Sequence, residues 1–414
     1  MHARSLISGT LAVGLLVAAC ASGPAAPSSG TPATSQSGPL PSTSQSAPPP
    51  TPVSTVEAGL GDWHRLPDPA AFTNASIRNV ARVSDGYIAT GCTTLPGELT
   101  CDQPAIWRAT DAVAWSEPTT LPMAPGETAG LAKAAVAVPA GLVVGGEVRL
   151  AGDRVHAALW FTPDGRSFER IADDPALEDA SVVALTTLGD RVIAIGAGAF
   201  MEPAGFRAWS SDDGRTWADA TPAGVGEPFP TGVLAREDGL VAWGPTCSVC
   251  PPSTAWWVSA DGSHWAEKAV DLGGRFANVT VVAEVEAGLV AYGTLGGGDD
   301  PVTPAGWFLP SDAEQWVTAV APPAPTPGTV DRFLLVGHGS VLAGTAWGQP
   351  AYRGFVWYQG PADESWRQAA LIPGIEVVAL LPDPVALERL IVVGRESAGT
   401  GATVIWSGTV DWAP

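Results

Sequence analysis

The stretch that decides the fold is FRAWSSDDGRTW, which runs from Phe206 to Trp217. A short β-prone run ends at Trp209, a polar turn surrounds Gly214, and Trp217 opens the next segment. Asp-Gly suits a tight hairpin turn, and Ser or Asp side chains can satisfy the N–H groups that such a turn leaves free. The stretch therefore predicts two antiparallel strands joined by a hairpin.

The first tryptophan of this stretch belongs to a series that runs along most of the chain. Its members are Trp107, Trp160, Trp209, Trp257, Trp307, Trp357 and Trp406, separated by 53, 49, 48, 50, 50 and 49 residues. A second aromatic follows each one, at Trp115, Phe168, Trp217, Trp265, Trp316, Trp366 and Trp412. A period near fifty residues, repeated seven times, indicates stacked supersecondary units.

Each unit is expected to hold four short strands. Around Trp209, the segments 182–185, 191–195, 206–209 and 216–219 are β-prone and separated by turn signals. Four hairpin-connected strands in about fifty residues make one propeller blade. We therefore predict an all-β fold over residues 58–414, a single seven-bladed β-propeller of four-stranded antiparallel blades.

A glycine also recurs once in every unit, after the second apolar run. We expect the second strand to end at this glycine, where the backbones approach closely. The series consists of Gly91, Gly146, Gly196, Gly244, Gly293, Gly344 and Gly394.

The segment 62–66 has the composition of a blade strand but precedes the first complete unit. We expect it to supply or extend the outer strand of the last blade. A ring closed in this way leaves no exposed sheet edge between its blades.

Three of the turns share the pattern Trp-x-[Ser/Thr]-x-Asp-Gly-x-x-[Trp/Phe]. After the leading tryptophan, their residues are Thr162, Asp164, Gly165 and Phe168; Ser211, Asp213, Gly214 and Trp217; and Ser259, Asp261, Gly262 and Trp265. These segments resemble the Asp-box, or BNR, repeat of sialidase-like and sortilin-like propellers. In such families the repeat is structural and lies away from the catalytic face. The resemblance therefore implies a scaffold and carries no activity with it.

Residues 1–19 are typical of a secretory signal peptide. Arg4 lies near the start, an apolar stretch runs from Leu11 to Val17, and small residues precede Cys20. The run from Val17 to Cys20 resembles the lipobox of bacterial lipoproteins, whose cysteine carries the lipid, such as palmitate. We expect lipid attachment at Cys20. The alternative is an ordinary signal peptide that a cysteine follows by chance.

Residues 20–57 are expected to form the lipidated cysteine and a disordered tether. Pro, Ser and Thr make up 23 of the 36 residues from 21 to 56, and the segment holds neither a charge nor an aromatic. A segment with so little apolar surface cannot offset the entropy lost on folding. The tether would space the propeller from the membrane.

The charge balance is acidic, with 42 Asp and Glu against 21 Lys and Arg and a net charge of −21. Such a surface repels nucleic-acid backbones and anionic headgroups, so we expect no nucleic-acid partner. The expected location is the cell membrane, on its extracytoplasmic side, with the N-terminal lipid as the only attachment.

Four cysteines remain once Cys20 is assigned to the lipid, and an even number in an exported protein suggests two disulfides. Cys92 and Cys101 bracket a loop, and Cys247 and Cys250 lie in the equivalent loop of another unit. The second pair could also be half of a zinc site or a redox pair, although no second ligand pair accompanies it. We expect two local disulfides, with neither a metal nor a cofactor.

No catalytic constellation stands out. Tyr87 and Tyr292 lie inside apolar runs, Tyr352 and Tyr358 flank a third strand, and no Gly-x-Ser-x-Gly motif is present. The many acidic residues do not single out the carboxylate pair of a glycosidase. We leave open whether the chain is an enzyme and favour that it is not.

The sequence thus favours a non-catalytic binding or scaffolding module for a protein or glycan partner. The loops 246–254 and 294–303 are candidate contact surfaces, and Trp256 and Trp347 are candidate contact aromatics outside the repeat positions. The alternatives are a glycan-processing, glycoside hydrolase-like enzyme and an assembly factor for a membrane protein complex.

Overall fold

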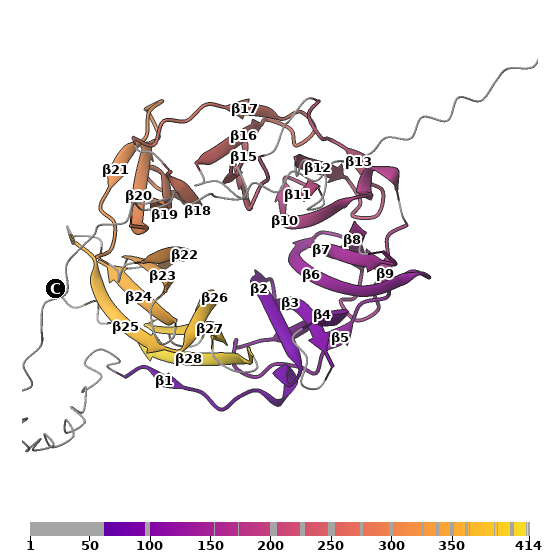
Figure 1. The fold of residues 1–414 in the computed structure, drawn as a ribbon, viewed down its shortest axis with the longest axis horizontal. Helices are drawn as coiled ribbons and strands as arrows, with labels where there is room; N and C mark the ends of the chain where they lie inside the picture. Colours follow the sequence, from indigo (N-terminus) through magenta and orange to yellow (C-terminus); the bar gives the residue numbers. More distant parts are fainter. Residues whose placement is uncertain are drawn as a thin grey trace, which may run out of the picture. The chain divides into compact units, whose positions relative to one another are not determined.

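In the computed structural model, seven four-stranded antiparallel sheets stand side by side in a ring (Figure 1). This confirms the predicted seven-bladed β-propeller. The structure describes residues 62–95, 100–152, 154–172, 174–198, 205–223, 228–246, 253–273, 276–297, 301–323, 327–336, 339–347, 352–360, 363, 365–384, 386, 388–397, 401–410 and 412.

The first strand of each blade faces the centre of the ring and the fourth lies outermost (Figure 1). Blade 1 holds β2 (Ala75–Val83), β3 (Gly86–Thr94), β4 (Cys101–Ala109) and β5 (Thr119–Thr120). Blade 2 holds β6 (Glu127–Val138), β7 (Gly141–Leu150), β8 (Val155–Thr162) and β9 (Glu169–Arg170). Blade 3 holds β10 (Ala180–Leu188), β11 (Arg191–Gly198), β12 (Phe206–Ser211) and β13 (Ala218–Asp219). Blade 4 holds β14 (Gly232–Arg236), β15 (Gly239–Pro245), β16 (Thr254–Ser259) and β17 (Ala266–Lys268).

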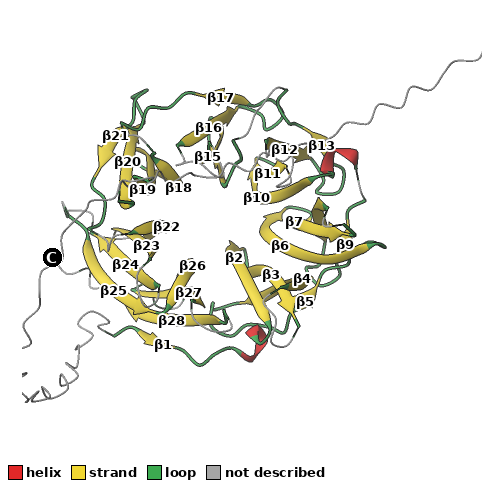
Figure 2. Ribbon diagram, in the orientation of Figure 1, coloured by secondary structure: helices red, strands yellow, loops and turns green. Residues whose placement is uncertain are grey.

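The remaining blades follow in chain order. Blade 5 holds β18 (Asn278–Val285), β19 (Gly288–Leu295), β20 (Thr303–Pro310) and β21 (Val317–Ala319). Blade 6 holds β22 (Gly328–Val336), β23 (Gly339–Ala346), β24 (Arg353–Gln359) and β25 (Arg367–Pro373). Blade 7 holds β26 (Ile375–Pro382), β27 (Arg389–Glu396), β28 (Thr403–Thr409) and β1 (His64–Arg65). Two 3-10 turns, η1 (Ala70–Phe72) and η2 (Pro175–Leu177), are the helical segments of the described chain (Figure 2).

The ring closes through β1, as predicted, because this N-terminal strand pairs with β28. The main-chain N–H of Leu66 extends the pairing to the carbonyl of Ile405 at 2.9 Å. The Asp62 carboxylate accepts hydrogen bonds from the main-chain N–H and the hydroxyl of Thr409, at 3.0 and 2.6 Å. The two ends of the described chain therefore share one blade.

The periodic tryptophans pack between and within blades. The first members in blades 1 to 5 are fully buried, and in four of these blades the indole N–H donates to a carbonyl in the segment that leads into the same blade. The pairs are Trp107 with Ala71 at 2.8 Å, Trp160 with Pro122 at 2.7 Å, Trp209 with Ala176 at 3.0 Å and Trp307 with Leu272 at 2.9 Å. In blades 1, 2, 3 and 5 the tryptophan thus fixes the connecting segment to its own blade.

The glycine series does not end the second strands, and that expectation was wrong. In blade 1, β3 continues to Thr94, three residues past Gly91. A Cβ at Gly91 would lie 2.1 Å from the carbonyl oxygen of Ser76 on the neighbouring strand. The glycine is needed because the first strand bulges against it, and the sheet continues beyond this point.

Several sequence-based predictions fall outside the described residues. These are the signal peptide, the lipid site at Cys20, the tether and the pair Cys247 and Cys250. Within the described ranges, no helix is long and apolar enough to cross a membrane.

Candidate functional site

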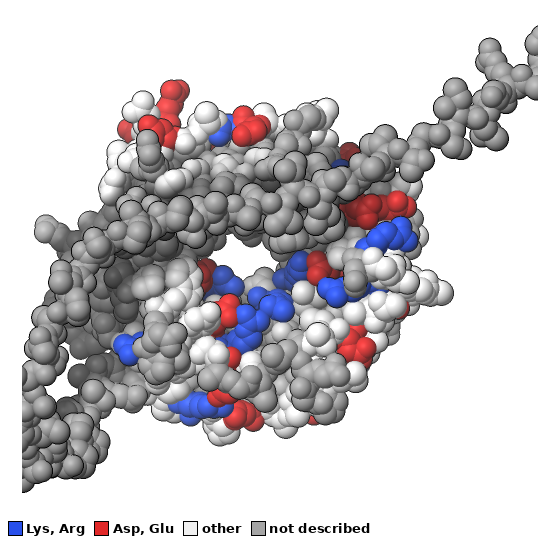
Figure 3. Space-filling model, in the orientation of Figure 1, with Lys and Arg blue, Asp and Glu red and all other residues white. Residues whose placement is uncertain are grey.

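A polar channel runs through the centre of the ring, and basic and acidic side chains gather along its rim (Figure 3). In six blades the first strand carries a bulge that inserts one extra residue. The inserted residues are Arg78, Lys133, Val183, Thr280, Asp331 and Val378. All of these except Val378 line a central cavity of about 540 Å³, together with Thr231 of blade 4. The bulges therefore select the side chains that face the channel.

Arg78 occupies a special position in this channel. Its side chain is exposed, and among the described residues it has no hydrogen-bond or ion-pair partner. Channel walls surround it even so, and this partial loss of water, together with the nearby Arg395, lowers the pKa of Arg78 from its ordinary value. Glu376 and Glu147 attract Arg78 without outweighing these effects, so Arg78 is a cation without a direct ionic partner in a confined space.

Two ion pairs flank Arg78. On one side, the Lys133 ammonium lies 2.6 Å from a Glu147 carboxylate oxygen and donates to the Ser181 hydroxyl at 2.8 Å. On the other side, the Arg395 guanidinium lies 2.5 Å from a Glu376 carboxylate oxygen. Each pair joins a second strand to a first strand, which fixes its position at the channel rim.

Burial and pairing oppose each other at these carboxylates. Loss of water would raise the pKa of Glu147, but Lys133 and the Ser181 hydroxyl outweigh it and hold that pKa below its ordinary value. Asp331 lies in the opposite wall and accepts a hydrogen bond from the Thr345 hydroxyl at 2.9 Å. There burial dominates and raises the pKa of Asp331 to about 6.

Three cavities meet at Arg78. Besides the channel, Arg78 lines a cleft of about 760 Å³ between blades 7 and 1, and a smaller one of about 250 Å³ between blades 1 and 2. The larger cleft also contains Tyr352, Glu376 and Arg395. Loops between second and third strands line both clefts, and the three cavities that share Arg78 as a lining residue are together called the groove at Arg78.

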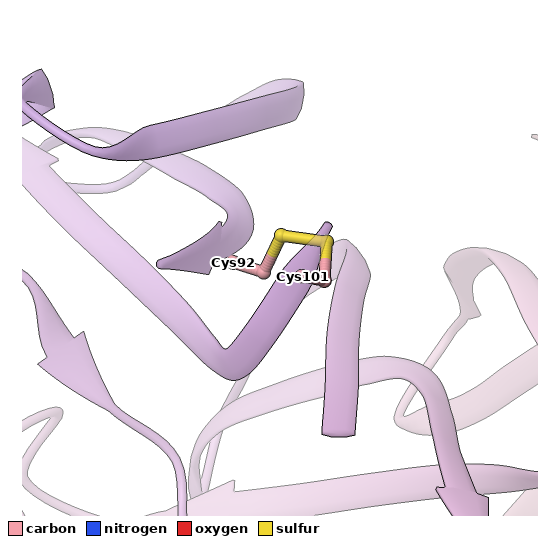
Figure 4. The surroundings of a disulfide bond; sticks show 2 residues. All are labelled: Cys92 and Cys101. Atoms are coloured by element: carbon pink, nitrogen blue, oxygen red, sulfur yellow. A yellow bond between two sulfur atoms is a disulfide. The ribbon is translucent and has the colours of Figure 1, made fainter. Parts of the chain in front are cut away.

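The predicted disulfide between Cys92 and Cys101 is confirmed (Figure 4). The bond closes the connection between β3 and β4, with the two Cα atoms 5.4 Å apart. Thr100 and Cys101 line the smaller cleft. The disulfide therefore holds one wall of the groove in place.

The three Asp-Gly turns lie at the opposite end of the blades, because they join third to fourth strands. In blade 3 the Asp213 carboxylate accepts the main-chain N–H groups of Arg215 and Thr216 at 2.7 and 2.6 Å. The Ser211 hydroxyl accepts the N–H of Gly214 at 2.8 Å. These hydrogen bonds, with the N–H groups first, lower the pKa of Asp213 to about 2.

The other two turns repeat this arrangement. Asp164 accepts from Arg166 and Ser167 at 2.8 and 2.9 Å, and Asp261 from Ser263 and His264 at 2.8 and 2.9 Å. The glycines Gly165, Gly214 and Gly262 have φ between +68° and +75°, and the aromatics at the end of the motif are Phe168, Trp217 and Trp265. Hydroxyls from Thr162, Ser211 and Ser259 are buried beneath the turns. None of these residues lines the groove at Arg78.

The remaining candidate residues from the sequence differ in how far they are buried. Tyr87 and Tyr292 are buried in the walls between blades, where burial raises the pKa of both phenols. Trp256 is only 3% exposed and packs against Trp316 with ring centroids 5.1 Å apart, so packing is the better interpretation of this candidate contact residue. Trp347 is 37% exposed.

Five residues of the channel mouth were not predicted from the sequence: Arg78, Lys133, Glu147, Glu376 and Arg395. One signal for the bulges was present, since the inserted residue lies 13 positions before the repeated glycine in blades 1, 2, 3, 5 and 6. Thr231 has the same spacing from Gly244.

Other cavities and clusters are less informative. A groove of about 820 Å³ lies between blades 4 and 5, lined by Trp256, Trp316 and charged side chains. It lies beside the Asp-Gly turn of blade 4 and away from the channel residues. Within the described ranges, no group of three or more His, Cys, Asp or Glu side chains is placed to hold a metal ion.

Comparisons with known proteins support the fold. No protein-family model matches the chain, and no curated protein matches it. An ulvan lyase of polysaccharide lyase family 25, bound to -[GlcA(1-4)Rha3S]-, aligns with a TM-score of 0.53 and 9% identity over 86% of this chain and 95% of its own. The two chains share a propeller fold.

Two further structures resemble the chain. A protein of unknown function from Dyadobacter fermentans aligns with a TM-score of 0.50 and 12% identity, over 84% of this chain and 96% of its own. An α-L-arabinanase from Penicillium chrysogenum, in complex with arabinobiose, aligns at 0.45 and 10% identity, over 84% and 98%. At 12% identity, the likeness to the Dyadobacter fermentans protein concerns the fold.

Proposed function

We propose that this propeller is a non-catalytic glycan-binding module whose ligand lies in the groove across the channel mouth. The observation that carries the proposal is the meeting of three cavities at Arg78, on blades 7, 1 and 2 and in the channel. Concave sites with a few convergent polar groups are the usual form of a small-ligand site. A long, polar groove accommodates an extended chain of sugars better than it accommodates the flat surface of a partner protein.

The proposal includes the location expected from the sequence. Lipid attachment at Cys20 and the tether to residue 57 would hold the propeller at the extracytoplasmic side of the cell membrane. The Asp-Gly turns, similar to Asp-box repeats, would serve as scaffold at the far end of the blades. Glycans at a cell surface are the natural ligands for a module held there.

The test is binding to a glycan array by the full chain purified in detergent. Thr73→Trp places a large side chain at an exposed position in the larger cleft and is expected to abolish binding. Ala260→Trp, at an exposed position in the groove between blades 4 and 5, is the matched control and is expected to bind as before. Failure of the unaltered chain to bind any glycan, with capture of a membrane protein subunit instead, would replace the proposal with the assembly-factor alternative.

A glycan-processing enzyme is the second candidate, and one observation favours it. The exposed Tyr352 shares the larger cleft with Glu376 and Arg395, so a phenol, a carboxylate and a guanidinium face one space. Chromatography of array-positive glycans after incubation with the protein separates the two functions. Intact glycans support the binding module, whereas shortened products that disappear with Tyr352→Phe support the enzyme.

A further inference from the structure

The channel mouth has an unusual charge composition for this protein. The whole chain carries two acidic residues for every basic one. Around the three cavities that meet at Arg78, the numbers are equal, with five basic and five acidic side chains. The basic ones are Arg78, Lys133, Arg149, Arg332 and Arg395, and the acidic ones are Asp68, Glu147, Asp331, Glu376 and Glu396.

The acidic side chains nearest to Arg78 are already engaged. Glu147 is paired with Lys133, and Glu376 with Arg395. Arg65, from β1, lies between Asp68 and Glu396 and contacts both at 2.8 Å. Each carboxylate therefore has a cation closer to it than Arg78. The Lys133–Glu147 and Arg395–Glu376 pairs are neutral, whereas Arg65 with its two carboxylates keeps one negative charge.

Asp331 does not supply an ionic partner for Arg78 either, and the adjacent Arg332 is itself engaged. The Asp331 carboxylate accepts from Thr345, and the Arg332 guanidinium donates to the main-chain carbonyls of Val378 and Asp331 at 2.7 Å each. These groups belong to the wall of blades 6 and 7. Arg78 thus makes no direct ion pair among the described residues, and Glu376 and Glu147 attract it without contacting it.

An anion at Arg78 would remove an electrostatic cost. The channel walls reduce the water around the guanidinium, and Arg395 repels it, which together lower the pKa of Arg78. A carboxylate or sulfate would restore a counter-charge and could accept two parallel N–H donors from the planar guanidinium. Water inside a narrow groove screens such a contact less than bulk water does.

The geometry of the cavities limits the ligand to one anionic group, at Arg78. Arg78 lies where the clefts of about 760 and 250 Å³ join the channel, so a bound chain extends away from it on both sides. On either side lies a neutral ion pair, suited to hydroxyl groups. The net charge of −21 also disfavours a ligand with closely spaced anionic groups.

We propose that the groove recognises an acidic glycan through a single anionic group, a uronate carboxylate or a sulfate ester, bound to Arg78, with neutral sugars in the clefts on either side. This inference rests on the proposed glycan-binding function and specifies its ligand class. Recognition by charge gives a large selectivity, because a neutral analogue would leave Arg78 without a counter-ion.

The experiment uses the full chain in detergent and isothermal titration with three versions of one oligosaccharide. One version carries a uronate, the second has the same carboxyl group reduced to an alcohol, and the third carries a sulfate ester in place of the uronate charge. We expect the unaltered protein to bind at least one acidic version 10 to 100 times more tightly than the neutral one. The version preferred identifies the anionic group.

Variants then assign the preference to Arg78. Arg78→Gln is expected to remove the preference, so that this variant binds the acidic and neutral versions equally well, whereas Arg78→Lys should retain part of the preference. Arg236→Gln, which removes a cation in the groove between blades 4 and 5, is the control and should keep the full preference. Thermal melting of each variant checks that the fold is retained.

The outcomes separate this inference from the proposed function. Equal binding of the acidic and neutral versions overturns the inference and leaves the glycan-binding function standing. A preference that survives Arg78→Gln also overturns it, because another residue must then bind the anion. Absence of binding to every version, alongside a glycan array without a hit, removes the proposed function itself.

Discussion

Gly146 lies so close to Leu131 on the neighbouring strand that a Cβ on the glycine would be 2.0 Å from the leucine carbonyl oxygen. A contact of this kind explains why the glycine recurs in blades 1 to 6. It accompanies the bulge between Ala132 and Ala134, which turns Lys133 into the channel. Equivalent contacts of 1.9 to 2.1 Å occur at Gly91, Gly196, Gly244, Gly293 and Gly344.

Gly146→Ala is therefore expected to destabilise the propeller strongly. The added methyl group meets main-chain atoms that cannot move without breaking the ladder between β6 and β7. We expect a loss of about 3 kcal/mol in the free energy of unfolding, at the upper end of the cost of overpacking. Urea unfolding followed by tryptophan fluorescence measures it.

Gly152→Ala is the matched control for that substitution. Gly152 has φ +80° and no atom within 4 Å of the added Cβ, so only backbone strain is expected, at about 1 kcal/mol. Equal losses for Gly146→Ala and Gly152→Ala would show that the close approach to Leu131 does not matter.

The tryptophan series permits a direct measurement of one repeated hydrogen bond. Trp209 and Trp257 are equally buried, but only the Trp209 indole N–H has a partner within the described chain, the carbonyl of Ala176 at 3.0 Å. Both Trp→Phe changes remove similar apolar volume. We therefore expect Trp209→Phe to cost about 1 kcal/mol more than Trp257→Phe. A cost at Trp257 that equals or exceeds the cost at Trp209 would contradict this assignment.

The disulfide at the groove is expected to stabilise the folded protein. Replacing Cys92 and Cys101 together by Ala removes a cross-link with a sequence separation of 9 residues. The chain-entropy model then gives a loss of about 2–3 kcal/mol. Urea unfolding of the double variant under non-reducing conditions measures the change. A variant as stable as the unaltered chain would mean that the loop is equally constrained without the bond.

The fold was predictable because its signals are local and repeat. A tryptophan every fifty residues and Asp-Gly turns such as Asp213-Gly214 specify the number of blades without any long-range information. The closing strand 62–66 was also predictable, since its pattern matches a strand that the last unit lacks. Each of these predictions depended on short sequence patterns, and none required knowing which distant side chains come into contact.

The site was not predictable, because a bulge changes which side of a strand each residue faces. Regular alternation along β2 gives no reason to place Arg78 in the channel, and a one-residue shift reverses its direction. The pairing of Glu376 with Arg395, and of Glu147 with Lys133, depends on neighbouring strands. The spacing of 13 residues to the repeated glycine would have located the bulged positions, but not their charge partners.

Asp331 provides a pH-dependent test of the channel wall. Burial raises its pKa to about 6 from an ordinary value of 3.8, so the folded protein holds this proton more tightly than the unfolded chain does. Ionised Asp331 consequently destabilises the fold above pH 6, and that penalty disappears as the pH falls below the unfolded value near 4. Two pKa units correspond to at most about 3 kcal/mol.

Asp331→Asn imitates the protonated carboxyl and keeps an acceptor for the Thr345 hydroxyl. We expect the variant to be more stable than the unaltered chain by about 1–3 kcal/mol at pH 7.5 and equally stable near pH 4. Urea unfolding at pH 4, 5.5 and 7.5 measures the difference between the two proteins, so that other titrating groups cancel. Asp238→Asn, at an exposed carboxylate, is the control and should change stability by less than about 0.5 kcal/mol throughout. The difference in the free energy of unfolding between Asp331→Asn and the unaltered chain could instead stay constant with pH. That result would show that Asp331 has the same pKa in the folded protein as in the unfolded chain.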